Sequence, residues 1–408
     1  MLSEVSSNVA SCLKCGACRL DWKTSEPICP SGMQFGFDSH YAIGRVSLAG
    51  AALADRAVLT ADAMRTVLSC TSCGACDVQC NPTVGVEPLR VIEALKQDGF
   101  QAGALPPELR DFLKSVSVYG NPYRLPQEER GRWAGGMGIE KYAHHDYLYY
   151  VGDVGSYDER GIRLARNVAR LLQAAGVSFG ILAEDEHCDG NEVEKVGEWE
   201  LFEYLAGQNI EQFRSLGVTR IVTLCPHAFN AMKVTYRRFG AQFEVLHYTQ
   251  LLTQLLRDGK LVPKKAMPSQ LTYHDPCFLG RHNGEFDSPR EVLDAIPGVK
   301  RVEMERSGEH GMCCGGGGGN FFTGLVGLGP RSPGRSRVRE AQATGARILA
   351  VACPNCNNML EDASRSEALS EQIAIRDVAG LLLEAMALDT EGARIDAGTD
   401  RPFHHQRR

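Results

Sequence analysis

Three short stretches decide the fold: His274-Asp275-Pro276-Cys277, Gly311-Met312-Cys313-Cys314-Gly315-Gly316-Gly317-Gly318-Gly319 and Cys353-Pro354-Asn355-Cys356. They hold five cysteines, with 35 residues between Cys277 and Cys313 and 38 between Cys314 and Cys353. Each stretch follows an apolar run of β character, at 271–273, 299–304 and 348–352. Loops that follow parallel strands gather at the carboxyl edge of an open sheet, where ligands usually bind. We therefore expect the five thiols to converge on one point.

The number of thiols favours a polynuclear iron–sulfur centre. Five thiolates exceed the tetrahedral count of zinc, and the adjacent Cys313 and Cys314 cannot both reach one ion comfortably, whereas several irons can share the ligands. The five glycines let the backbone approach an inorganic core, permit positive φ and can aim N–H groups at sulfur. The alternatives are a zinc site, a group of redox-active thiols, and a phosphate loop, which the absence of a following Lys-Ser/Thr disfavours.

A second cysteine pattern occupies the first third of the chain. Two C-x-x-C-x-x-C runs, at 12–18 and 70–76, are each followed by a further cysteine. Such runs are typical of paired cubane [4Fe-4S] clusters, in which the fourth cysteine of each run ligates the other cluster. Two zinc ribbons are the alternative, although they leave the third cysteine of each run unexplained. The predicted ligand sets are Cys12, Cys15, Cys18 and Cys80 for one cluster, and Cys29, Cys70, Cys73 and Cys76 for the other.

The segments between these cysteines are predicted to be helical. Apolar residues recur at helical intervals between Cys29 and Cys70, and Thr60 is placed to cap a helix there. Another helix is expected from Glu87 to Gly99, with Pro88 in its first turn. The insert 19–28 is expected to loop out. Residues 1–119 are therefore predicted to form an all-α domain.

The remainder of the chain reads as two copies of one α/β unit. After a Gly- and Pro-rich linker at 120–145, apolar β-runs at 147–151, 177–182, 220–224 and 243–247 alternate with amphipathic segments such as 162–175. This alternation indicates βαβ units and a parallel sheet. The same order recurs downstream, at an offset of roughly 125 residues. The predicted units are 146–262 and 268–388, followed by a tail, 389–408, that is expected to be mobile.

Comparing the two copies shows which ligand positions the first has lost. It keeps Cys188 and Cys225 but has Asp153, His187 and Ala228 at the other positions, so it cannot bind the same cluster through the same ligands. Asp153, His187, Cys188 and Cys225 form a candidate set for zinc or a further cluster. The alternative is a metal-free fold whose loops form the floor of the intact site. In the second copy, His274 and His282 flank Cys277 and can deliver protons there.

Composition excludes several classes of function. A net charge of −6 and a pI near 6.0 give no electrostatic footprint for nucleic acid. Fifteen cysteines, mostly in C-x-x-C runs, do not indicate a disulfide scaffold. Neither a signal peptide nor an apolar run of about 18 residues is evident. We therefore expect a cytoplasmic protein, for which any contact with a membrane pool requires another subunit.

The second copy resembles the CCG domain of the heterodisulfide reductase family, in which C-x(about 35)-CC-x(about 38)-C-x-x-C binds a noncubane [4Fe-4S] cluster. The first 119 residues resemble the C-type subunit of that family and the cluster module of succinate dehydrogenase, and nearly the whole chain resembles the D-type subunit. The resemblance implies an α+β multidomain protein: a helical two-cluster ferredoxin domain followed by two α/β CCG repeats, the first degenerate. It further implies that the noncubane ligands are Cys277, Cys313, Cys314, Cys353 and Cys356.

Related proteins are cluster subunits of anaerobic redox complexes, including dissimilatory sulfite-reduction membrane complexes and class II benzoyl-CoA reductase. We therefore predict an iron–sulfur electron-transfer subunit of a larger oxidoreductase, partnered by a flavoprotein, a hydrogenase or a catalytic reductase subunit. No G-x-G-x-x-G nucleotide fingerprint is present. The alternative is a heterodisulfide or thiol–disulfide reductase acting at the noncubane cluster. The family's disulfide cleavage uses two facing noncubane clusters, so the degenerate repeat favours the relay, and the sequence leaves independent turnover open.

Overall fold

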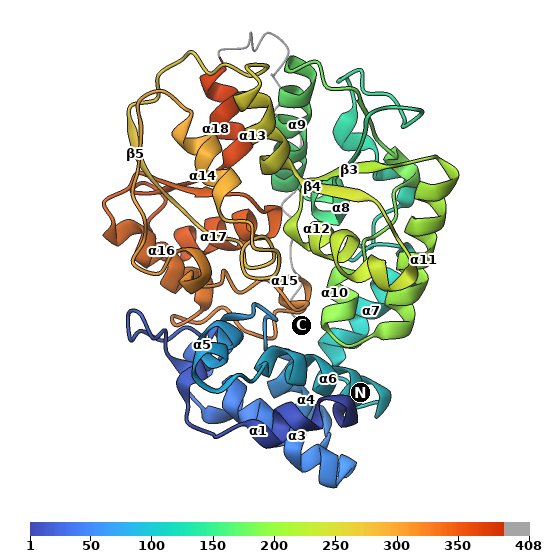
Figure 1. Cartoon of the computed structure of the whole chain (residues 1–408), viewed down its shortest axis with the longest axis vertical. Coiled ribbons are helices and arrows are strands. Elements are labelled where there is room, and N and C mark those ends of the chain that lie inside the picture. Colours follow the sequence, from blue (N-terminus) through green and yellow to red (C-terminus); the bar gives the residue numbers. More distant parts are fainter. Residues whose placement is uncertain (387–408) are drawn as a thin grey trace.

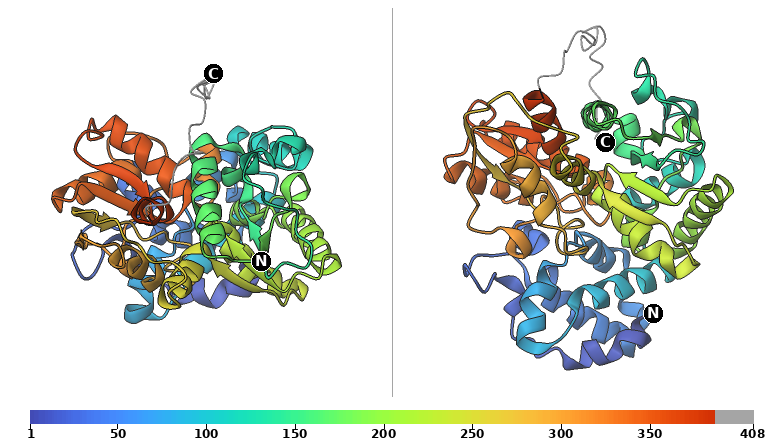
Figure 2. Two further views of the ribbon diagram at one scale, coloured as in Figure 1. Left: turned by 90° about the horizontal axis from the view of Figure 1, so that it is seen from above. Right: turned by 45° about the horizontal axis from the view of Figure 1, so that its top comes forward.

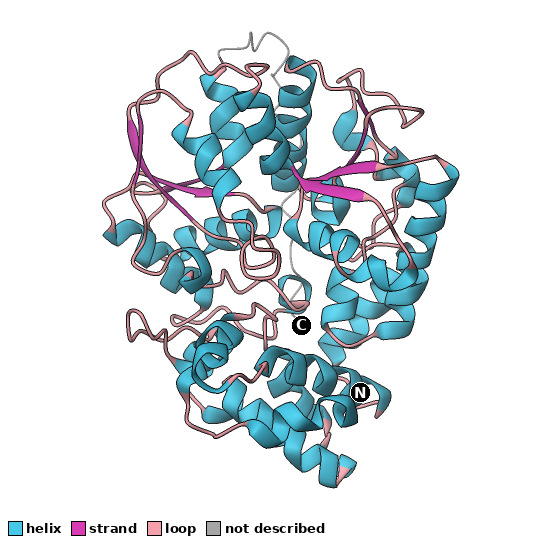
Figure 3. Cartoon of the chain, viewed as in Figure 1, coloured by secondary structure: helices cyan, strands magenta, loops and turns pink. Residues whose placement is uncertain are grey.

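The computed structural model describes residues 1–386, and the predicted tail 389–408 lies outside them. The helices of residues 1–101 lie at the bottom of Figure 1, beneath two α/β units that stand side by side, and α7 (Pro107–Tyr119) lies against the first unit. Within the described residues, strands occur only in these two units (Figure 3). The predicted order, an all-α part followed by two α/β parts with parallel sheets, is confirmed.

The N-terminal third is built from short helices between the cysteine loops. Thr60 caps α4 by accepting a hydrogen bond from the N–H of Ala63, and Pro88 is the first residue of α6, as the sequence predicts. The α-helices are α1 (Ser6–Ser11), α2 (Pro30–Phe35), α3 (Ala42–Ala54), α4 (Ala61–Leu68), α5 (Ala75–Val84), α6 (Pro88–Gln101) and α7 (Pro107–Tyr119).

The first α/β unit contains a four-stranded parallel sheet in the order β2-β1-β3-β4. The strand predicted at 177–182 is much shorter, because the chain turns after residue 180 and makes only an isolated bridge to Lys141. The elements are β1 (Tyr147–Tyr150), α8 (Gly152–Tyr157), α9 (Glu159–Ala174), β2 (Phe179–Gly180), α10 (Asn191–Lys195), α11 (Trp199–Ser215), β3 (Arg220–Thr223), α12 (Pro226–Lys233), β4 (Glu244–His247) and α13 (Tyr248–Arg257).

The second unit repeats this topology, with parallel strands in the order β6-β5-β7-β8. The matching orders confirm that one supersecondary unit occurs twice. Strand β7 is buried on both faces, as expected for a parallel sheet covered by helices. The elements are β5 (Ser269–Tyr273), α14 (Asp287–Asp294), β6 (Val299–Arg301), α15 (Asn320–Thr323), α16 (Pro333–Ala343), β7 (Ile348–Val351), α17 (Pro354–Ser366), β8 (Ala374–Asp377) and α18 (Val378–Ala385).

Helices α9, α13, α14, α17 and α18 form the seam between the two units (Figure 2). The seam includes buried polar pairs: the Tyr248 hydroxyl donates to Asp377 Oδ2 at 2.7 Å, and the hydroxyls of Thr249 and Ser288 lie 2.9 Å apart. Because buried polar groups need partners, these pairs fix how the units meet. The carboxyl edges of the two sheets are thereby held in a defined relation.

Two segments that the sequence predicts to be loose are packed against the α/β units. In the linker 120–145, Trp133 is 2% exposed and its ring meets Tyr149 edge-on. The insert 19–28 loops out as predicted, but its base is anchored: Leu20 and Pro27 form an antiparallel bridge, Asp21 is fully buried and contacts His310, and the Pro27 carbonyl accepts a hydrogen bond from Arg306. Both segments are held by side-chain contacts with residues far away in the sequence, which local composition does not reveal.

The glycine loop, residues 311–319, packs directly onto the helical N-terminal domain. An added Cβ at Gly317 would lie 2.5 Å from the Thr71 carbonyl oxygen, and one at Gly318 would lie 2.6 Å from that of Cys70. Gly318 also has a φ of +62°, which favours glycine. These glycines therefore bring the loop that carries Cys313 and Cys314 within backbone contact of the loop that carries Cys70 and Cys73.

We predict that Gly317→Ala separates the two loops. Its methyl group overlaps the Thr71 carbonyl, and relief of such an overlap costs about 1–3 kcal/mol, so the thermal unfolding midpoint should fall. Gly207→Ala is the matched control, because an added Cβ there meets nothing within 4 Å and alanine favours the helix α11. Equal unfolding midpoints for the two variants would contradict this role of Gly317.

Candidate functional site

The five cysteines of the second unit meet at the carboxyl edge of its sheet. Cys277 lies in the turn after β5, Cys353 is the N-cap of α17, and Cys356 is in the first turn of that helix. Cys313 and Cys314 enter from the glycine loop, and all five are buried. The Sγ atoms of Cys314 and Cys356 are 3.3 Å apart. Hydrogen bonds between Cys277 and Cys313, Cys313 and Cys314, and Cys353 and Cys356 complete one connected group.

These contacts make the thiols electrostatically unequal. The hydrogen bond to Cys313, together with burial, raises the pKa of Cys277 well above its usual range. Hydrogen bonds from Cys313 and Cys356 hold the pKa of Cys314 well below it. Each thiolate in such a group is stabilised only while its neighbours keep their protons, because like charges repel at short distance. All five can ionise together only if a cationic centre is bound among them.

Two cations flank these sulfurs, the buried Lys96 and the partly buried Arg281. Arg281 donates from Nε to the Cys73 carbonyl at 2.7 Å and from Nη1 to that of Gly311, and Lys96, 1% exposed, donates to the Cys70 carbonyl at 3.0 Å. Neither forms an ion pair with a carboxylate within residues 1–386. Buried positive charge requires negative charge nearby. A set of metal-bound thiolates supplies it, so the residues present fit an iron–sulfur centre.

The first unit contributes to this same site, as the alternative of a metal-free fold beneath the intact site predicts, although the sequence did not indicate which of its residues take part. Cys225 and His227 both hydrogen-bond to Cys353, and although burial acts in the opposite direction, these bonds and one from Cys356 hold the pKa of Cys353 well below its usual range. His227 Nδ1 contacts Glu192, whose other carboxylate oxygen accepts from the N–H of Gly319 in the glycine loop. The alignment of Cys225-Pro226-His227 with Cys353-Pro354-Asn355 was the available signal.

The candidate metal set of the first repeat is brought together only in part. Asp153 hydrogen-bonds to Cys188, while its Oδ1 accepts from the fully buried Arg130 at 2.7 Å, and Cys225 faces Cys353. In the part of the chain that the structure describes, no three of Asp153, His187, Cys188 and Cys225 place ligand atoms within 4.8 Å of one another. A metal ion at these four residues therefore stays a prediction.

The ferredoxin cysteines form two groups that follow the crossed pattern. Cys12, Cys15, Cys18 and Cys80 line one cavity together with side chains of α3 and α5. Burial, with the neighbouring Cys29, Cys80 and Cys12 thiols, raises the pKa of Cys18 to about 12. Burial and the nearby Cys70 and Cys73 likewise raise the pKa of Cys29 to about 11. Cys29 is thus a neighbour of the later run, and the ligand sets themselves stay a prediction.

The second ferredoxin group touches the five-cysteine group. Cys73 hydrogen-bonds to Cys313, and the Cys313 Sγ lies 3.7 Å from Thr71 Oγ1. Cys73, Cys277, Cys313 and Phe278 belong to one buried contact group. On the same side, His282 Nε2 lies 2.8 Å from the Ser72 carbonyl oxygen, and burial lowers its pKa to about 4. Two groups of candidate ligands from different domains are therefore in direct sulfur contact.

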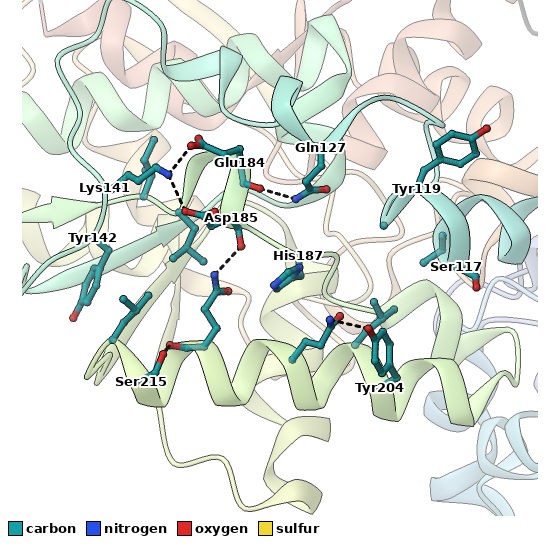
Figure 4. A pocket seen from close by; sticks show the side chains of 18 of the residues that line it. Ser117, Tyr119, Gln127, Lys141, Tyr142, Glu184, Asp185, His187, Tyr204 and Ser215 are labelled. Atoms are coloured by element: carbon teal, nitrogen blue, oxygen red, sulfur yellow. Dashed lines mark hydrogen bonds and ion pairs between the residues drawn. The ribbon is translucent and has the colours of Figure 1, made fainter.

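A large cavity lies elsewhere, between α7, α11 and the segment 181–187 (Figure 4). It measures about 910 Å³ and has no cysteine in its lining, although His187 points into it. Its charges are already paired: Lys141 Nζ lies 2.6 Å from Glu184 Oε1 and 2.8 Å from Asp185 Oδ2. The cavity is therefore separate from the sulfur chemistry.

Comparison with known proteins agrees with this architecture. The 4Fe-4S dicluster domain family matches residues 8–84, and the cysteine-rich CCG domain family matches residues 154–233 and 271–361. Among the described residues, no helix combines the length and apolarity needed to cross a membrane.

Several curated proteins are similar to this chain over most of its length. The D-type subunit of the dihydromethanophenazine:CoB–CoM heterodisulfide reductase of Methanosarcina barkeri is 36% identical over 79% of each chain. The probable iron-sulfur-binding oxidoreductase FadF of Bacillus subtilis is 36% identical over 78% of this chain, and the EtfAB:quinone oxidoreductase of Syntrophomonas wolfei is 33% identical over 79%. The chain spans about half the length of the latter two, since the match covers 46% of each.

We predict that Asp153 is held by an ion pair rather than by a metal. Arg130→Leu should lower the free energy of unfolding by about 3–5 kcal/mol, because it leaves the buried carboxylates of Asp153 and Glu186 without their cation. Arg132→Leu is the control: its side chain is 73% exposed and its pair with Glu129 is worth at most about 1 kcal/mol. The free energies of unfolding are measured by denaturation with and without a zinc chelator. A chelator that lowers the free energy of unfolding of the unsubstituted chain would contradict the prediction.

Proposed function

We propose a three-centre electron route for this chain, which belongs to the family of the D-type subunit of heterodisulfide reductase. The chain is an iron–sulfur electron-transfer protein of the oxidoreductase class. The proposed centres are a cubane [4Fe-4S] cluster on Cys12, Cys15, Cys18 and Cys80, a second on Cys29, Cys70, Cys73 and Cys76, and a noncubane [4Fe-4S] cluster on Cys277, Cys313, Cys314, Cys353 and Cys356.

The observation that carries the proposal is the close approach of Cys73 to Cys313, whose buried thiols interact with each other and belong to one contact group. These residues belong to different proposed centres, so electrons need cross no intervening protein layer between the second cubane site and the noncubane site. Arg281 reinforces the junction by bonding to carbonyls on both sides, those of Cys73 and Gly311. Bound clusters supply the one-electron chemistry, while these residues fix the spacing and exclude water.

The opposite end of the route faces solvent. Cys15 is exposed, and the side chain of its neighbour Leu13 is 72% exposed. We place electron exchange with a partner at this loop, since the five-cysteine site is buried. One similar protein is named for EtfAB and a quinone, and another for dihydromethanophenazine and the CoB–CoM heterodisulfide. The proposed partners are those that the sequence resemblance implies: a flavoprotein, a hydrogenase or a catalytic reductase subunit, with any membrane pool reached through a further protein. Fifteen free cysteines fit a reducing cytoplasm.

A second candidate function is a thiol–disulfide reductase that acts on its substrate at the noncubane cluster. The observation that favours it is Cys225, a further buried thiol that hydrogen-bonds to Cys353. Disulfide cleavage takes two electrons and leaves two thiolates, each of which needs stabilisation. Because the first repeat has lost its own set of five cysteines, the relay is the better supported function.

The ligand sets can be tested by grouping variants. The anaerobically purified chain should contain about twelve irons and no zinc. Cys80→Ala should lose the same electron paramagnetic resonance signal as Cys15→Ala, and Cys29→Ala the same signal as Cys76→Ala, because each trailing cysteine serves the other run. Loss of one signal in both Cys80→Ala and Cys76→Ala would overturn the crossed assignment, and about sixteen irons would indicate a fourth cluster in the first repeat.

The two functions differ in what the isolated chain can do. We predict that the chemically reduced chain does not turn over a mixed disulfide at a useful rate, yet passes electrons to the complex with which it co-purifies. Both rates should be measured on one preparation, together with Cys313→Ser as the control for the noncubane site. Rapid disulfide reduction by the chain alone, abolished by Cys313→Ser, would establish the reductase and refute the relay.

A further inference from the structure

His274 lies beside two sulfurs of the five-cysteine site. It follows β5 directly and is 1% exposed. One of its ring nitrogens lies within 4.8 Å of the Cys314 and Cys356 sulfurs. Within residues 1–386, its buried Nε2 makes no hydrogen bond. A buried polar atom without a partner costs about 1–3 kcal/mol, so its retention calls for a bound group that satisfies it.

Arg337 decides what that nitrogen can do. Its Nε lies 3.2 Å from His274 Nδ1, and a guanidinium can only donate hydrogen bonds. Nδ1 must therefore present its lone pair, which places the ring proton on Nε2. Arg337 is itself fully buried and fixed, since its Nη1 donates to Glu340 Oε2 at 2.7 Å and to the Arg306 carbonyl at 2.8 Å. The tautomer thus follows from geometry alone.

We propose that His274 is a hydrogen-bond donor to the sulfurs of the noncubane centre, through Nε2–H, and that Arg337 is the positioning residue that imposes this role. The inference deepens the proposed function and rests on it. A donor to cluster sulfur stabilises the reduced state more than the oxidised one, because reduction adds negative charge to the sulfurs. His274 therefore raises the potential of this one centre relative to the cubane centres.

The other histidine at the site is held by the opposite kind of partner. His227 Nδ1 faces the carboxylate of Glu192, which can only accept while ionised, so Nδ1 carries a proton. His227 also hydrogen-bonds to Cys353 and lowers the pKa of that thiol, so its second nitrogen donates to the thiolate as well. The two histidines thus act differently: Arg337 leaves His274 a single N–H, which is on Nε2, whereas Glu192 favours a proton on both nitrogens of His227.

The test is a redox titration of the anaerobic full-length chain, followed by electron paramagnetic resonance. His274→Phe should shift the midpoint of the noncubane centre to a more negative potential and leave both cubane midpoints unchanged, so that these serve as internal controls. The His274→Gln side chain can donate to sulfur through its amide while its oxygen accepts from Arg337. Its midpoint should therefore lie close to that of the unsubstituted chain. Arg337→Met should shift the midpoint in the same direction, because His274 is then free to move its proton.

A spectroscopic readout separates hydrogen bonding from packing. Electron–nuclear double resonance after exchange into D₂O should show a deuteron coupled to the noncubane centre that is lost in His274→Phe and kept in His274→Gln. Equal midpoints in the unsubstituted chain and His274→Phe, or equal shifts in the Phe and Gln variants, would overturn the proposal. If His274→Phe loses the centre, the Gln and Arg337→Met variants decide the matter by the same criteria. An iron count near eight in the unsubstituted chain would instead refute the underlying three-centre assignment.

Discussion

The structure depends on holding sulfur atoms in contact where water cannot screen them. Cys314 and Cys356 approach to 3.3 Å, and every member of the five-cysteine group is buried. As free thiols these residues are compatible neighbours, but as thiolates they repel strongly in a medium of low dielectric constant. The site can be anionic only around bound cations. The arrangement of loops, glycines and cations around it follows from that requirement.

This requirement explains why the first repeat is retained after losing its own ligands. Its Cys225 and His227 hydrogen-bond to Cys353. Its Glu192 contacts His227 with one carboxylate oxygen and accepts from the Gly319 N–H with the other. The alternative of a metal-free first repeat beneath the site therefore describes its position correctly. It does not describe its chemistry, because this repeat supplies hydrogen-bonding groups to the candidate ligand Cys353. A single α/β unit would leave that side of Cys353 open to solvent.

Sequence reasoning succeeded where the signal was local or periodic. The alternation of apolar β-runs and helices predicted both sheets, the offset of about 125 residues predicted their common topology, and Thr60 and Pro88 marked helix starts that the structure contains. It failed where a side chain chooses between distant partners. Cys225 was assigned to its own repeat, yet it faces Cys353, because the seam between the units turns the two sheet edges toward each other. Asp21 and Trp133 were missed for the same reason.

Charge balance links two of the three proposed sites, the one at Cys70 and Cys73 and the five-cysteine site. Lys96 and Arg281 bond mainly to carbonyl oxygens, and burial lowers the pKa of Lys96, which shows that its charge has a desolvation cost that no direct ion pair within residues 1–386 offsets. Both cations sit where the ferredoxin loop meets the glycine loop, so negative charge arriving on either side stabilises them, and they stabilise it. An electron at the proposed second cubane site and one at the proposed noncubane site would therefore share the same counter-charges. Because these cations cannot favour one site without also favouring the other, the difference in potential that directs the electron must come from groups specific to one side. His274, with its proton fixed on Nε2 by Arg337, is such a group.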